Sequence, residues 1–69
     1  LDLENDYKIL EISINSSDSQ IEKAYRKLIK KYNPDKLQGV SDDVIKMAKD
    51  KFNKVGQAYK RIMKSRGWY

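Results

Sequence analysis

The run Asn33-Pro34-Asp35 is the part of this sequence whose residue types and spacing are best suited to binding chemistry. Pro34 removes a backbone hydrogen-bond donor and disfavours helical dihedral angles at Asn33, so a helix is expected to end there. The Asp35 carboxylate is then held on an exposed turn. Because Asn-Pro and Pro-Asp also begin ordinary turns, the run by itself predicts either a plain turn or a contact point for a partner.

A ridge of basic side chains precedes this turn. Its members are three and four residues apart, which places them on one side of a helix: Lys23, Arg26, Lys27 and Lys30. The adjacent Glu22 is not expected to reduce the positive charge of the ridge. One interpretation is a solvated face that keeps a small domain soluble, and the other is a surface that attracts an acidic partner.

The sequence contains no histidine and no cysteine. This removes the commonest general base, the commonest metal ligand and any thiolate metal site or disulfide. A chain of 69 residues also offers little room for a pocket that would shift the pKa values of the remaining acids and bases. We therefore expect a single domain that is not an enzyme and that holds no metal or other cofactor.

The elements that must position these residues are helical. Apolar residues at spacings of three and four predict one long helix over residues 18–31 and a second over residues 42–64. A short helix over residues 6–10 precedes them, and no strand pattern competes. The predicted fold is all-α, with two long antiparallel helices and a short N-terminal helix that covers one flank.

Residues at the predicted helix ends support these boundaries. Ser17 and Gln20 have the spacing of a capping box, Ser41 is suited to an N-cap, and Gly67 is suited to a C-cap. Gly56 weakens the second long helix, and we expect it to permit close packing against a neighbouring helix.

The side chains of the apolar stripes are expected to form the core. They include Val44, at the start of the second long stripe, and most aromatic residues, with the Tyr25 hydroxyl reaching the surface. The sequence does not place Trp68 and Tyr69, which either fold back on the core or belong to a contact outside this chain.

The sequence resembles the J domain of DnaJ-type co-chaperones. The matching segments follow the family's order and cover almost the whole chain: Tyr7-Lys8-Ile9-Leu10 with Ile12-Ser13, Ile21–Leu28, Lys31–Lys36, and Lys51-Phe52 with Val55 and Ala58-Tyr59. Three further features are most similar to the C-terminal J domain of membrane-anchored bacterial DjlA-type proteins: the longer loop with Lys36-Leu37 and Gly39, the run Met47-Ala48-Lys49, and the ending Arg66-Gly67-Trp68.

The resemblance implies a function by contact. J domains bind DnaK-type heat-shock chaperones and stimulate their ATP hydrolysis. The residues that would make this contact, matched by position, are Tyr25, Arg26, Lys27, Lys23, Lys30, Asn33, Pro34 and Asp35. In this scheme Pro34 fixes the shape of the loop and Asp35 pairs with a chaperone arginine. Neither nucleic acid nor direct membrane contact is expected of this segment.

One residue departs from the family motif, which is His-Pro-Asp, because position 33 is Asn here. Asn33 offers a hydrogen bond roughly where one imidazole nitrogen would lie, but it lacks the ring's bulk, its stacking surface and its option of carrying a charge. Loss of this histidine generally abolishes ATPase stimulation in the family. Three interpretations stay open: a divergent J domain that still stimulates, a J-like domain that binds without stimulating or pairs with another J protein, and an engineered inactive variant.

A basic nucleic-acid-binding domain is the less favoured alternative, and it rests on the net charge of +5. A helix-turn-helix joins its helices by about 3–4 residues, whereas the loop expected here runs from Asn33 to Ser41. The acidic pair Asp42 and Asp43 would also face the phosphates.

We expect residues 1–69 to form one J domain from a longer protein, since the first residue is Leu1. The expected location is the cytoplasm, or the cytoplasmic face of the inner membrane if the parent protein is of the DjlA type.

Overall fold

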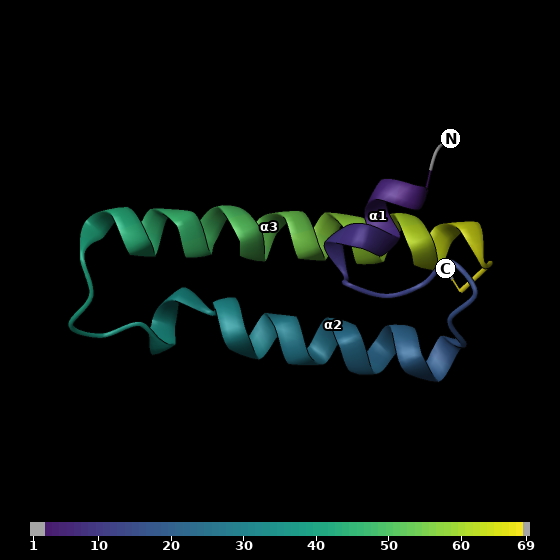
Figure 1. Ribbon diagram of the computed structural model, residues 1–69, viewed down its shortest axis with the longest axis horizontal. Helices are drawn as coiled ribbons and strands as arrows, with labels where there is room; N and C mark the ends of the chain where they lie inside the picture. The colour runs from purple at the N-terminus through teal and green to yellow at the C-terminus, as the bar shows by residue number, and fades with distance from the viewer. Residues whose placement is uncertain (1–2, 69) are drawn as a thin grey trace.

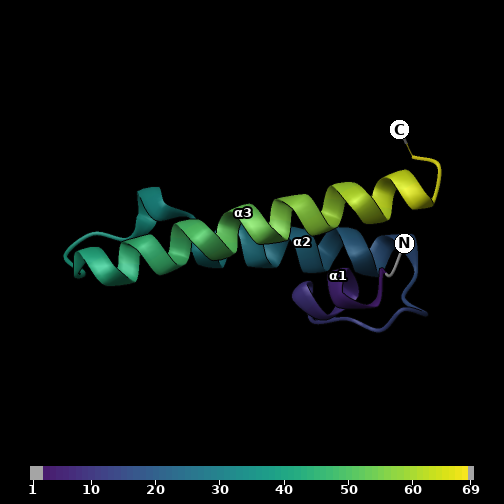
Figure 2. The ribbon, with the colours of Figure 1, turned by 90° about the horizontal axis from the view of Figure 1, so that it is seen from above.

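The computed structural model describes residues 3–68, which form three α-helices and one short 3-10 helix. Their bounds are α1 Glu4–Ile9, α2 Asp18–Tyr32, the 3-10 helix η1 Pro34–Lys36 and α3 Asp42–Ser65. The helices α2 and α3 lie antiparallel and side by side (Figure 1). Seen from above, α1 lies to one side of this pair and packs on α3 (Figure 2). The predicted all-α fold is confirmed, whereas η1 was expected to be an irregular turn.

The core forms where the apolar stripes of the three α-helices meet. Its buried side chains are Tyr7, Leu10, Ile21, Leu28, Val55, Ala58 and Ile62. Burying each of the larger ones contributes about 1.5–3 kcal/mol to stability. Trp68 is half-buried against this cluster, so the chain folds back onto the core after α3. Tyr69 lies outside the described residues.

The expected helix caps are present. The Ser17 hydroxyl accepts a hydrogen bond from the Gln20 backbone N–H at 3.2 Å, and the Ser17 N–H donates to the Gln20 side chain at 2.8 Å, which completes a capping box. Ser41 caps α3. At the other end of α3, Gly67 adopts a φ of +78°, and the Trp68 N–H donates to the Met63 carbonyl at 3.0 Å. These features form a Schellman motif, in which glycine avoids the strain of the left-handed region.

A partly buried ion pair joins α1 to α3, and its Arg61 side chain is 45% exposed. The Asp6 residue is only 4% exposed, and its carboxylate accepts hydrogen bonds from Nε and Nη2 of Arg61, each at 2.8 Å. These bonds raise the pKa of the Arg61 guanidinium. The pair fixes the position of a helix that is too short to be stable alone.

Arg66 makes a second link between distant segments. Its guanidinium donates to the Tyr7 hydroxyl at 3.1 Å, to the Asp18 carboxylate at 2.7 Å and to the Ser16 carbonyl at 2.9 Å. The hydrogen bonds to Asp18 and Tyr7 raise the pKa of Arg66. The end of α3 is thereby tied to α1 and to the start of α2.

Two expectations about α3 are wrong. Val44 is 45% exposed, because the 24 residues of α3 extend past the end of the 15-residue α2, so that its first turns are not covered by α2 (Figure 1). Gly56 does not permit a close approach of helices, since no atom lies within 4 Å of the position that a Cβ would occupy.

Replacing Arg61 with alanine should lower the free energy of unfolding by about 2 kcal/mol, because it leaves the Asp6 carboxylate buried without its partner. Urea unfolding followed by circular dichroism measures the change. Lys54→Ala is the control, since it removes an ion pair with Asp50 whose side chains are 61% and 64% exposed. That variant should change stability by less than about 0.5 kcal/mol. Equal effects of the two variants would contradict the structural role of the Asp6–Arg61 pair.

Gly56→Ala should raise the free energy of unfolding by about 1 kcal/mol, because alanine favours the helix and its methyl group meets open space. Gly39→Ala provides the contrast. Gly39 has a φ of +76°, so alanine there should lower stability by about 1 kcal/mol despite equally open surroundings. A loss of stability in Gly56→Ala would show that the glycine has a packing role after all.

Candidate functional site

The basic ridge of α2 faces solvent. The exposed members are Lys23, Arg26, Lys27 and Lys30, and the opposite side of the same helix buries Ile21 and Leu28 in the core. Within the described part of the chain, none of the three lysines forms an ion pair. The ridge expected from the sequence is therefore present as a row of exposed cationic side chains on α2.

Glu22 modifies this ridge, contrary to expectation. Its carboxylate pairs with the Arg26 guanidinium one helical turn away. The Arg26 side chain stays 71% exposed, so it can still reach a partner, and an exposed pair of this kind is worth at most about 1 kcal/mol. Glu22 therefore lowers the positive charge around Arg26 without removing Arg26 from the surface.

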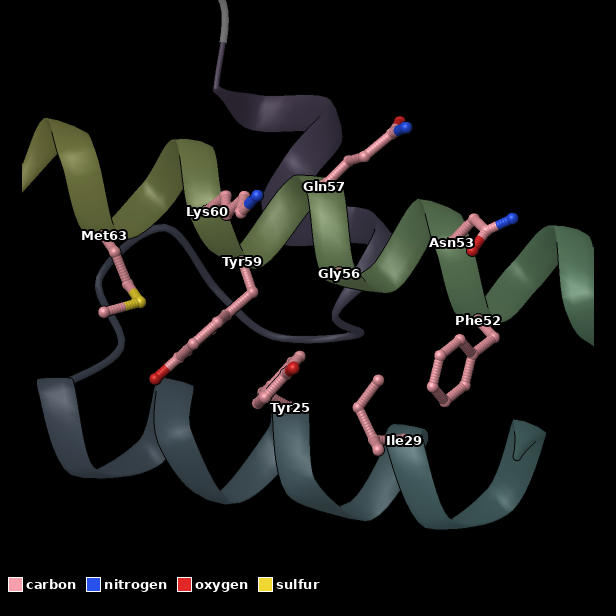
Figure 3. Close-up of a pocket in the computed structure, with 9 residues that line it drawn as sticks. All are labelled: Tyr25, Ile29, Phe52, Asn53, Gly56, Gln57, Tyr59, Lys60 and Met63. Carbon is pink, nitrogen blue, oxygen red and sulfur yellow. The ribbon is translucent and has the colours of Figure 1, made fainter. Parts of the chain in front are cut away.

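Tyr25 differs from the other predicted contact residues because it is also part of the packing between helices. Its ring stacks on Tyr59 of α3, with centroids 3.9 Å apart and an angle of 8° between the planes. Figure 3 shows Tyr25 and Ile29 pointing from α2 toward α3, with Phe52 and Tyr59 pointing back. Burial, followed by the negative charge of Glu22, raises the pKa of Tyr59. Tyr25 can present only the part of its ring that this stack leaves open.

The Asn33-Pro34-Asp35 run forms a compact, hydrogen-bonded turn. Asn33 has extended dihedral angles, and its Oδ1 accepts a hydrogen bond from the Asp35 N–H at 3.1 Å. Pro34 opens η1, where its fixed φ suits a helical start. The Lys36 N–H then donates to the Asn33 carbonyl at 3.1 Å. The Asp35 side chain is exposed on a backbone that the Asn33 side chain helps to hold in place.

The ridge and the turn are adjacent along the chain. Helix α2 ends at Tyr32 and η1 begins at Pro34, so a single residue, Asn33, separates them. A partner that covers the last turns of α2 would therefore lie close to η1, where the Asp35 side chain is exposed. The arrangement suits recognition by charge and hydrogen bonding. Among residues 3–68 there is no group of three or more acidic side chains that could hold a metal ion.

Lys51 is a residue of this region that the sequence did not indicate as a contact. Its Nζ lies 5.3 Å from the centroid of the Tyr32 ring, and the Lys31 Nζ lies 5.4 Å from the same centroid. Two cations therefore border the aromatic ring that ends α2. The position of Lys51 in the sequence does not indicate a contact with Tyr32, because the two residues come close only when α3 packs beside α2.

Comparison with known families gives a match to the DnaJ domain over residues 5–68. The chain belongs to the DnaJ domain family. This membership confirms the resemblance seen in the sequence, and it confirms the expectation of a co-chaperone domain rather than an enzyme. No solved structure matches the chain significantly.

Among curated proteins, this DnaJ domain is similar to Co-chaperone protein DjlA from several bacteria. It is 38% identical to that of Legionella pneumophila over 64 residues, which are 90% of this chain and 22% of the relative. It is 35% identical to that of Haemophilus influenzae over 68 residues, covering 96% of this chain and 24% of the relative. The matches support the DjlA-type resemblance, and the chain spans less than a quarter of the length of these two relatives.

Of the helices that the structure describes, none combines the length and the apolar character needed to cross a membrane.

Proposed function

We propose that this DnaJ domain binds a DnaK-type heat-shock chaperone and regulates its ATP hydrolysis. The observation that carries the proposal is that the exposed basic ridge of α2 is followed after one residue by the Asn33-Pro34-Asp35 turn's short helix, in a chain of the DnaJ domain family. The similarity to Co-chaperone protein DjlA supports a role as a co-chaperone module.

The lysines of the ridge act mainly through their charge in this proposal. Lys23, Lys27 and Lys30 project from α2 into solvent, where their field speeds encounter with an acidic surface of the chaperone. Arg26 adds planar hydrogen bonding once it exchanges Glu22 for a partner carboxylate.

The turn orients the Asp35 carboxylate in this proposal. Pro34 and the Asn33–Asp35 hydrogen bond restrict the backbone before the partner arrives, which lowers the entropy cost of binding. The Asp35 carboxylate then pairs with an arginine of the chaperone through charge-assisted hydrogen bonds.

Asn33 favours a second version of the function, in which the domain binds the chaperone without stimulating ATP hydrolysis. Its side-chain oxygen is used within the turn, and an amide cannot supply the bulk, stacking surface or charge of the histidine in the family motif. Both versions share the same contact surface, so they differ in activity rather than in binding.

We place this activity in the cytoplasm, or at the cytoplasmic face of the inner membrane if the parent protein is of the DjlA type. The similarity to DjlA proteins motivates this location.

Asn33→His should raise the stimulation of ATP hydrolysis, because the imidazole restores the ring and the option of a charge, both of which the amide lacks. The measurement is the single-turnover ATPase rate of a purified DnaK-type chaperone with and without the domain. Asn33→Ala is the matched control, and it should not stimulate ATP hydrolysis more than the original chain does. If a folded Asn33→His variant neither binds the chaperone nor changes its ATPase rate, the proposed function is wrong.

Lys27→Glu should weaken binding to the chaperone about tenfold, because it reverses one charge at the centre of the ridge. Glu22→Gln should strengthen binding modestly, since it releases Arg26. Titrations at two salt concentrations should show both effects shrinking as ionic strength rises. Lys64→Glu, which makes the same charge change at an exposed site on α3, should have a much smaller effect. Equal losses in Lys27→Glu and Lys64→Glu would point to non-specific attraction.

A further inference from the structure

A groove lies beside the Asn33-Pro34-Asp35 turn, where the first turns of α3 extend past the end of α2. We call it the tip groove. It has a volume of about 350 Å³ and is lined by Lys31, Tyr32, Leu37, Val44, Met47, Ala48 and Lys51. The groove thus contains residues from α2, from the loop after η1 and from α3.

Large apolar side chains are unusually exposed around the tip groove. Met47 is 63% exposed, Val44 45% and Val40, in the adjacent loop, 39%. In the described part of the chain, the other large hydrophobic side chain of this kind is Ile14, which is 55% exposed and does not line the groove. Isolated exposed apolar residues are common, but three that gather at one end of a small domain indicate a contact surface.

The rim of the tip groove is basic. The ammonium groups of Lys31 and Lys51 each lie within 5.5 Å of the Tyr32 ring centroid, at 5.4 and 5.3 Å. An apolar floor with cationic walls fits an apolar side chain that is carried on an acidic segment.

We infer that the tip groove receives an apolar side chain from an acidic segment of the same chaperone that contacts the Asn33-Pro34-Asp35 turn. This inference rests on the proposed function. Leu37 follows η1 directly and Tyr32 precedes Asn33, so a partner engaged at the turn is already beside the groove. The groove then extends the contact from α2 onto the first turns of α3.

The surface of the tip groove favours an acidic chaperone segment over a second copy of the chain or a nucleic acid. A second copy of the chain would bring a net charge of +5 against the same basic rim. A nucleic acid would satisfy the lysines with its phosphates, but it would leave Val44 and Met47 against water. An acidic partner with an exposed apolar side chain satisfies both parts of the surface.

The test measures binding of the chain to a purified DnaK-type chaperone, with ATP present, by fluorescence anisotropy. Met47→Ser with Val44→Ser should weaken binding about tenfold or more, because the apolar contact is lost. Ile14→Ser removes an equally exposed apolar side chain elsewhere and should leave binding unchanged. Circular dichroism checks that each variant is folded, which is expected because the substituted side chains are exposed.

The rim is tested by Lys51→Glu, which should weaken binding several-fold. Lys49→Glu makes the same charge change at an exposed position that does not line the groove, and should have a smaller effect. This pair keeps the inference testable if the double serine variant fails to fold.

The outcomes separate the inference from the proposed function. If the original chain binds but the Met47 and Lys51 variants bind equally well, the tip groove is not a contact and the inference alone is overturned. If the original chain and its Asn33→His variant both fail to bind, both proposals are overturned. A loss of self-association in Met47→Ser, seen by sedimentation without any change in chaperone binding, would assign the groove to a second copy and overturn the inference.

Discussion

The antiparallel packing of α2 on α3 is the constraint on which the other features of this domain depend. Ile21 and Leu28 face α3, and this contact determines which side of α2 is left to solvent. The basic residues occupy that other side, so the seam that stabilises the helices also presents the ridge. Rotating α2 about its axis would bury lysines and expose the core, which makes the rotational position of the ridge a consequence of core packing.

Ion pairs and hydrogen bonds fix the relative positions of the helices, which a small apolar core cannot specify by itself. The Asp6–Arg61 pair holds α1 against α3, and Arg66 joins the end of α3 to Tyr7 and Asp18. Hydrogen bonds of this kind are directional, whereas apolar burial tolerates small shifts of one helix along another. The bonds of the two arginines therefore restrict the relative positions of all three α-helices. Both arginines lie toward the end of the domain opposite the turn.

Helical periodicity and end signals predicted most of the fold, because they depend on residues close together in the sequence. The capping box at Ser17, the end of α2 before Pro34 and the exposed ridge all follow from spacings of a few residues. The partner of Asp6 could not be predicted, since it lies 55 residues away and its position depends on how the helices pack.

The tip groove was missed for a related reason. Val44 continues the apolar stripe of α3, and periodicity alone assigns such a residue to the core. The exposure of Val44 follows from the unequal lengths of α2 and α3, 15 and 24 residues, which leave the first turns of α3 opposite a loop. Comparison of the predicted helix lengths could have indicated this overhang. The contact of Lys51 with Tyr32 required the packed structure itself.

The described ends of the chain lie together at one end of a domain 39 Å long, and the turn with Asp35 lies at the other (Figure 1). The long axis of the domain therefore separates these ends from the turn. A linker or fluorescent label joined near residue 3 or residue 68 would not obstruct the turn. Anchored at that end, the domain would hold the turn outward, at the far end of the helical pair.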